Sequence, residues 1–218
     1  MAGEPESLDT DESLARRRHR HWFDRLIMLS DGVFAIAITL LALNIQLPDV
    51  AESRLADLWA PLAPQLDAYA LSFVAISVFW LAHRRFLAMI TTADAAVTVI
   101  NLVMLALVAL LPAATRVAHL PGPAAPHMMI YGGLIVAIGV SLAALWCYAA
   151  LIVNLVSSEV SRSQRWFFFV LILMTPPFFL GLTSVLRNPA PGAVPLFLTT
   201  LFLIGWRMRL WVLRRLGA

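Results

Sequence analysis

The stretch RLIMLSDGVFAIAITLLALNI, residues 25–45, is apolar along most of its length but carries a serine, an aspartate and a glycine near its charged end. An ionisable side chain inside a membrane span is costly, and an aspartate at a helix centre costs about 2.5–3.5 kcal/mol on insertion scales. Asp31 lies close to the end of the stretch, which lowers this cost. Its carboxylate still requires polar partners at the same depth.

Other polar side chains fall at that depth if successive spans cross the membrane in opposite directions. His83 then lies near the end of the second span, and Asn101 lies near the start of the third. A network that joins Ser30, Asp31, His83 and Asn101 would satisfy these groups where water is scarce. Trp80, one turn from His83, is either part of this network or an anchor at the lipid interface.

A simpler interpretation needs no network. Asp31 would cap the start of its helix, His83 would reach the lipid headgroups, and Asn101 would bond a neighbouring carbonyl. Arg25 stands six residues before Asp31, and at about 100° per residue the two side chains face different directions. Pairing of Arg25 with Asp31 is therefore expected to run across helices or protomers.

The composition indicates which kind of structural element must position these residues. Of the 218 residues, 61% are hydrophobic and 13% are charged, whereas soluble domains are about half apolar and a quarter charged. The apolar residues are gathered in runs long enough for a membrane helix, which needs about 20 residues. Six spans are predicted, at roughly 27–47, 67–88, 96–117, 128–156, 166–186 and 192–212. The proline-bearing segment 48–65 is interpreted as a loop. The predicted fold is an all-α integral membrane protein.

Arginine placement predicts the orientation, because cytoplasmic loops carry the excess of basic residues. If the N-terminus is cytoplasmic, the outer side carries only Arg54, Arg116 and Arg187, and all other arginines lie inside. Both termini are therefore predicted to be cytoplasmic. The predicted division is a partly disordered cytoplasmic segment at 1–24, a six-helix transmembrane domain at 25–213, and a cytoplasmic tail at 214–218.

The first span also carries an apolar stripe. Ile36, Leu40 and Leu43 are spaced i, i+4, i+7 and cover about 10 Å of helix axis, with Thr39 beside them. Most spanning helices contain such a stripe, so the spacing alone does not indicate a pore. The sequence shows no nucleophile–base arrangement and no metal-ligand cluster, which argues against an enzyme, a metal site or a cofactor. The arginines lie at span ends rather than in one patch, so nucleic-acid binding is not predicted.

The first span resembles the first-helix signature of the transmembrane-protein-175 family of endolysosomal potassium channels and their prokaryotic relatives, R-x3-F-S-D-G-V-F-A-I-x2-T-L-L. The match runs from Arg25 to Leu41, with Leu29 where phenylalanine is usual. A W-x2-H-x2-F motif follows in the second span, and an asparagine and a proline follow in the third, carried by Trp80, His83, Phe86, Asn101 and Pro112. Beyond Pro112 the resemblance is limited to topology and hydropathy.

This resemblance implies a homotetramer of six-helix protomers with a central pore lined by the first helix. It places the pore constriction at Ile36, with Leu40 and Leu43 as further apolar rings and Thr39 as a polar layer. The expected structural polar network, which would anchor the pore helix, consists of Arg25, Ser30, Asp31, Trp80, His83 and Asn101.

The implied function is a potassium-permeable cation channel with modest selectivity for K+ over Na+, located in the cell (inner) membrane. The expected partners are other copies of the chain, membrane lipid, and K+ and other monovalent cations. Two alternatives remain open at this point. One is a proton-conducting channel, and the other is a small-solute membrane transporter.

Overall fold

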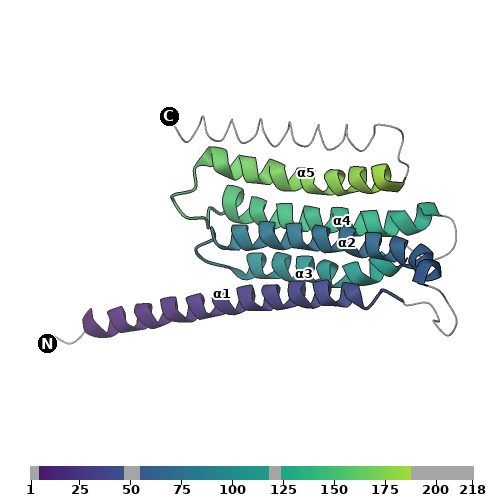
Figure 1. The fold of residues 1–218 in the computed structure, drawn as a ribbon. Helices are drawn as coiled ribbons and strands as arrows, with labels where there is room; N and C mark the ends of the chain where they lie inside the picture. Colours follow the sequence, from purple (N-terminus) through teal and green to yellow (C-terminus); the bar gives the residue numbers. More distant parts are fainter. Residues whose placement is uncertain (1–4, 47–54, 118–123, 188–218) are drawn as a thin grey trace. The chain divides into compact units, whose positions relative to one another are not determined.

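The computed structural model describes residues 5–46, 55–117 and 124–187, and these are almost entirely helical (Figure 1). The elements are α1 Pro5–Ala42, α2 Leu55–Leu87, α3 Ala95–Val117, α4 Ala124–Trp146, the π-helix η1 Cys147–Ile152, and α5 Arg162–Arg187. Within these residues there is no β-strand, and the one β-bridge pairs Ile90 with Val156. The all-helical prediction is confirmed for this part of the chain.

Four helical segments of the described chain are long and apolar enough to cross a membrane: His21–Ala42, Pro61–Leu87, Ala95–Val117 and Met129–Ile152. They coincide with the first four predicted spans, and the chain is therefore a multi-pass membrane protein. α5 covers the predicted fifth span, whereas the predicted sixth span and the tail at 214–218 lie outside the described residues. Six spans and cytoplasmic termini stay predictions.

Several boundaries differ from those expected. α1 begins at Pro5, where a proline suits the first helical position, and it therefore includes most of the segment 1–24. α1 ends at Ala42 rather than 47, because its last amides bond three residues back instead of four. α2 begins at Leu55 and contains Pro61 and Pro64, so the expected loop at 48–65 is wrong for its second half.

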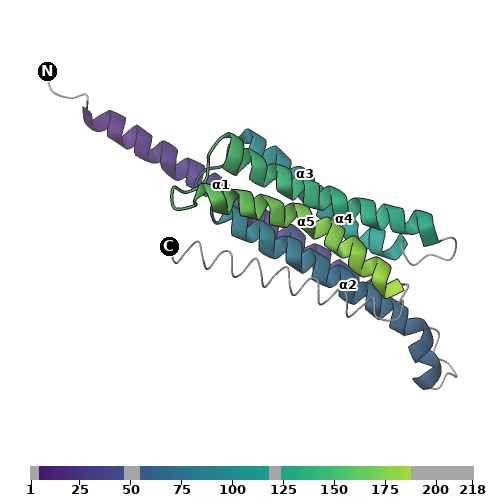
Figure 2. The same cartoon turned by 90° about the horizontal axis from the view of Figure 1, so that it is seen from above.

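The chain divides into two compact units, residues 1–176 and 177–218. In the first unit, α1 packs on α2 and α3, and α3 packs on α4, as the two views in Figures 1 and 2 show. The buried face of α1 follows helical spacing and consists of Leu26, Ser30, Phe34, Ala37 and Leu41. Gly139 of α4 allows close contact with the Pro176 ring of α5, because a Cβ at position 139 would overlap it.

Two connections meet at one end of these helices. Residues 88–94 join α2 to α3, and residues 153–161 join η1 to α5. Thr91 N donates to Leu155 O at 2.9 Å, and Ser157 N donates to Met89 O at 3.0 Å. Asn154 adopts a left-handed backbone with φ of 59°, a conformation that asparagine tolerates well. The bridge makes the two connections a single structural feature.

Candidate functional site

Ser30, His83 and Asn101 form one chain of hydrogen bonds across three helices. His83 Nε2 of α2 donates to Asn101 Oδ1 of α3 at 2.6 Å, since a carbonyl oxygen can only accept. Asn101 Nδ2 donates to Ser30 Oγ of α1 at 3.0 Å, and Ser30 Oγ donates to Leu26 O at 2.8 Å. The order of donors and acceptors fixes the position of each side chain.

This network is sealed from solvent. Ser30 and Asn101 are 0% exposed and His83 is 1% exposed. The Phe34 ring lies 5.5 Å from the His83 ring, centroid to centroid. Among the described residues, no buried side-chain nitrogen or oxygen lacks a hydrogen-bond partner. Each such bond contributes about 1 kcal/mol net, but loss of one partner leaves a buried polar group that costs about 1–3 kcal/mol.

Asp31 lies beside this network and bonds a different residue. Trp80 Nε1 of α2 donates to Asp31 Oδ1 at 2.8 Å. The Arg84 guanidinium carbon lies 5.4 Å from the centre of the same Trp80 ring, in a cation–π arrangement. Trp80 therefore connects a carboxylate on α1 with a cation one turn along α2, rather than serving only as a lipid anchor.

The single expected network is divided in the structure, because Asp31 and Trp80 bond each other rather than Ser30, Asn101 or His83. Arg25 joins neither group. Its side chain is exposed, and no hydrogen bond or ion pair joins it to another side chain in the described part of the chain. This agrees with the angular separation of Arg25 and Asp31 on one helix. Pairing of Arg25 across protomers stays a prediction.

The residues expected to line a pore lie on the opposite face of α1, away from α2 and α3. Ile36 is 59% exposed and Leu43 is 77% exposed, and Leu40 and Thr39 are exposed as well. Thr39 Oγ1 donates to Ile36 O at 2.9 Å, so its hydroxyl hydrogen is satisfied within the helix. α1 therefore presents one face that the protomer buries and one apolar face that the protomer leaves open.

A contact that the sequence analysis missed holds the far end of this open face. Asn44, directly after the last stripe residue, donates from Nδ2 to the backbone oxygen of Pro112 on α3 at 2.7 Å. α1 and the turn that follows it are thus bonded to α3 at both ends of the stripe, through Ser30 and through Asn44. Every peptide has a carbonyl, so nothing in the sequence marked Pro112 O as the acceptor.

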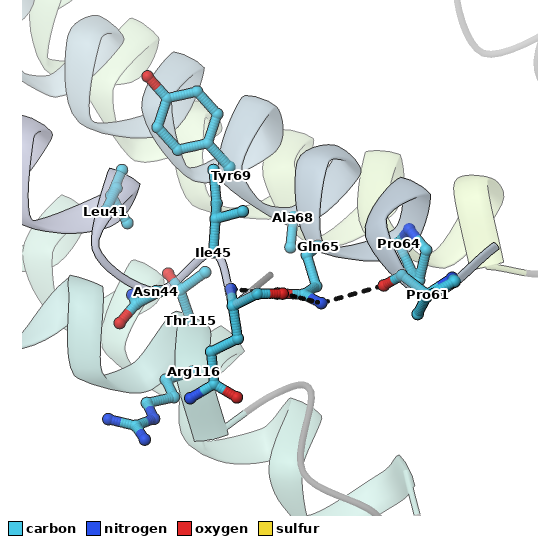
Figure 3. Close-up of a pocket in the computed structure, with 11 residues that line it drawn as sticks. Leu41, Asn44, Ile45, Pro61, Pro64, Gln65, Ala68, Tyr69, Thr115 and Arg116 are labelled. Carbon is cyan, nitrogen blue, oxygen red and sulfur yellow. Dashed lines mark hydrogen bonds between the residues drawn. The ribbon is translucent and has the colours of Figure 1, made fainter. Parts of the chain in front are cut away.

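A pocket of about 410 Å³ lies at the Asn44 end of α1 (Figure 3). The segment after α1 is joined to α2 there, because Gln65 Oε1 accepts from Gln46 N at 2.7 Å and Gln65 Nε2 donates to Gln46 O at 3.3 Å. Its lining residues are Leu41, Asn44, Ile45, Gln46, Pro61, Pro64, Gln65, Ala68, Tyr69, Thr115 and Arg116. The pocket leaves room beside the end of α1.

A second buried hydroxyl network was also missed. Ser72 Oγ of α2 lies 2.9 Å from Thr115 Oγ1 of α3 and 3.2 Å from the Tyr131 hydroxyl of α4. Thr115 Oγ1 donates to Leu111 O at 2.8 Å. Serine and threonine are common in membrane helices, so their presence alone predicts no particular partner. The network ties α2, α3 and α4 together without touching the open face of α1.

The start of α3 is fixed by Asp94. Asp94 Oδ1 accepts from Val97 N at 2.8 Å, which is an N-cap arrangement. Asp94 Oδ2 accepts from the Tyr148 hydroxyl of η1 at 2.7 Å. The hydrogen bond from the Val97 amide is the main cause that lowers the pKa of the Asp94 carboxyl below its ordinary value. Burial opposes this shift, and the hydrogen bond from the Tyr148 hydroxyl lowers the pKa further. The carboxylate form is therefore favoured.

Comparison with known proteins bears on this region of the chain. The family model of the endosomal/lysosomal potassium channel TMEM175 matches residues 25–112, a range that contains both attachments of α1 to α3. A potassium channel of Streptomyces collinus is 35% identical over 129 residues, 56% of this chain and 62% of that one. A potassium channel of Chamaesiphon minutus is 34% identical over 150 residues, 64% of this chain and 72% of that one. The match thus spans less than two thirds of the Streptomyces relative.

The fold gives the same assignment. The crystal structure of a lysosomal potassium-selective channel TMEM175 homolog from Chamaesiphon minutus superposes with a TM-score of 0.64 at 27% identity. The superposition covers 87% of this chain and 97% of that chain. Proteins of this family are channels and not enzymes. The chain belongs to the family of the endosomal/lysosomal potassium channel TMEM175.

Proposed function

We propose that this protein is a potassium-permeable cation channel in the cell (inner) membrane, formed by four copies whose α1 helices line a central pore. The observation that carries the proposal is the division of α1 into two faces. One face is fixed by the buried hydrogen bond that Ser30 accepts from Asn101, and the other exposes Ile36 and Leu43. Family membership supports the same assignment, since the relatives are named potassium channels.

The constriction is placed at Ile36, with Leu40 and Leu43 as further apolar rings and Thr39 as a polar layer. An apolar neck offers no ligands that replace the hydration shell of an ion, so ions pass it with much of their water. Potassium holds its water less tightly than sodium does, which gives a modest preference for K+. Small movements of α1 are enough to open or close such a neck, because apolar constrictions gate by dewetting.

The buried network gives the reason that a membrane helix keeps Ser30 and Asp31. A pore-lining helix must present its rings in register with those of the other copies. Ser30, bonded to Asn101, fixes the rotation of α1 relative to α3, and Asp31, bonded to Trp80, fixes it relative to α2. These residues are positioning residues and do not contact the permeating ion.

The test is a recording of the purified protein in planar bilayers under opposed gradients of K+ and Na+. A discrete conductance that reverses towards the potassium equilibrium potential supports the proposal. The Ile36→Asn variant should conduct more and select less, because an amide ring wets the neck. Unchanged currents and selectivity in that variant would contradict the place of the constriction.

The same preparation separates the alternatives. Current that persists after an acid jump in potassium-free proteoliposomes would indicate a proton channel. Saturable uptake of a solute, without single-channel events, would indicate a transporter. An intact oligomer that is silent in every ionic condition would contradict the channel assignment altogether.

A further inference from the structure

Gly32 interrupts the open face of α1. At about 100° per residue, Gly32 lies about 20° from Thr39 and about 40° from Ile36 around the helix. At about 1.5 Å per residue it lies about 6 Å along the axis from Ile36, on the side that leads to Ser30 and Asp31. The stripe therefore continues towards the N-terminal end of α1 through a residue without a side chain.

Within residues 5–46, 55–117 and 124–187, no packing contact gives a reason for this glycine. No heavy atom lies within 4 Å of the place that a Cβ on Gly32 would take, and the residue is exposed. Its backbone is helical, so it does not need the freedom of positive φ that only glycine offers easily. Glycine inside a helix is destabilising relative to alanine. The described residues of the protomer therefore do not account for the absence of a side chain at position 32.

Gly139 shows the contrast within the same chain. A Cβ there would overlap the Pro176 ring, so close packing of α4 and α5 accounts for that glycine. Gly133 of α4 is different again, because it is exposed and its Cβ position is open, as at Gly32. Gly133 is not on α1, which makes it a matched control for Gly32.

We infer that Gly32 sets the width of a vestibule on the predicted cytoplasmic side of the Ile36 constriction, and that this vestibule holds a hydrated monovalent cation. The inference rests on the proposed function, since it requires the open face of α1 to line the pore. Around a four-fold axis, four glycines leave a wider and more polar ring than four leucines. The exposed helix backbone at this level contacts water, and an ion can keep its hydration shell until it meets Ile36.

The assignment makes Gly32 a conductance-determining position, which can be tested by the size of the side chain. Gly32→Ala should lower the unitary conductance about twofold, and Gly32→Leu should lower it about tenfold or more, since a second apolar ring dewets the vestibule. Gly133→Ala and Gly133→Leu should keep wild-type conductance. A Gly32→Leu channel with wild-type conductance overturns the inference.

A second variant tests the same position without a large side chain that could prevent folding. In a Cys147→Ser background, Gly32→Cys introduces one small thiol that can be modified after assembly by a charged methanethiosulfonate reagent. We expect modification from the predicted cytoplasmic side to reduce current severalfold, with no effect on the Cys147→Ser parent. If mass spectrometry shows a modified thiol with unchanged current, or a thiol that never reacts, the vestibule is not at Gly32.

Ile36→Asn, recorded in the same series, separates the two proposals. If Ile36→Asn leaks while the Gly32 variants conduct normally, α1 lines the pore and only the vestibule assignment fails. If neither position affects the current of an intact oligomer, the open face of α1 does not line a pore, and the proposed function fails with it.

Discussion

The two attachments of α1 to α3 are built in different ways. At Ser30 the contact is fully buried and continues through Asn101 to His83, so three helices share one network. At Asn44 a single half-buried hydrogen bond reaches Pro112 O, just beyond the last turn of α1. A pocket of about 410 Å³ borders the Asn44 contact.

The difference indicates which end of the proposed pore helix can move. Breaking the Ser30 contact leaves buried polar groups without hydrogen-bond partners, because water cannot reach them. Asn44, in contrast, can exchange its hydrogen bond for one to water. Packing around Ser30 is closed, and the pocket leaves space around the end of α1. We therefore expect α1 to pivot about the Ser30 contact, with most of the displacement at Leu40 and Leu43.

The largest effect is expected from Asn101→Leu. This change leaves the His83 Nε2 hydrogen without an acceptor, which costs about 1–3 kcal/mol in a buried site. The thermal midpoint of unfolding in detergent should fall clearly. Adding His83→Phe should restore part of it, because both polar partners are then apolar. An Asn101→Leu variant as stable as the wild type would contradict the claim that the buried contact at Ser30 is the harder of the two to break.

The next effect concerns the Asp31–Trp80 bond, the second restraint on the same part of α1. A hydrogen bond to a charged group is worth about 1.5–3 kcal/mol, and partial exposure reduces this to about 1 kcal/mol. A double-mutant cycle of Asp31→Ala and Trp80→Phe should show coupling of that size. The open probability of the channel should change more than its reversal potential does. Additive effects of the two variants would show that the bond does not restrain α1.

Asn44→Ala should have a smaller effect on stability than Asn101→Leu, about 0.5–1.5 kcal/mol, because water can replace the lost partner. Its effect on gating should exceed its effect on stability, since it frees the end of the helix that already has room to move. Gln46→Ala is the matched control, because the hydrogen bonds of Gln46 with Gln65 involve its backbone atoms. Equal gating in both variants would contradict the proposed pivot.

The smallest effect is expected at Asp94, at the beginning of the helix that carries Asn101. Because folding lowers the pKa of this carboxyl, the stabilisation is complete above the ordinary carboxyl pKa of about 4 and is lost as pH falls through the lower folded value. Asp94→Asn should keep the cap but flatten this dependence. Unfolding midpoints measured from pH 6 downward provide the check, and parallel curves for both proteins would refute it.

The sequence predicted the contact at Ser30 and missed the contact at Asn44, for a physical reason. Asn101 and His83 lie within apolar runs, where a polar side chain must have a partner, and alternating topology brings them to the depth of Ser30. Asn44 lies at the edge of its span, where water is a sufficient partner, so its polarity raised no expectation. Its acceptor, Pro112 O, is a backbone atom and has no signature.

The prediction of helix boundaries from the sequence was limited in the same way. Hydropathy predicted the first four spans but not that α2 begins at Leu55, because two prolines suggested a loop and a proline within a helix leaves no hydropathy signal. The π-helix Cys147–Ile152 was equally invisible, since the change from α to π spacing alters hydrogen bonding and not composition. The open position of Ile36, in contrast, was expected only from the family resemblance, because its spacing with Leu40 and Leu43 does not by itself indicate a pore.

The bridge between residues 89–91 and 155–157 has a mechanical consequence. Together with the Tyr148–Asp94 bond, it joins the segment after α4 to the first residue before α3. A partner that pulled on residues 153–161 would therefore load α3 at its N-terminus, and through Asn101 the tension would reach α1 at Ser30. Force applied to the segment 153–161 would thus be transmitted to α1, the helix proposed to line the pore, although the two are distant in sequence.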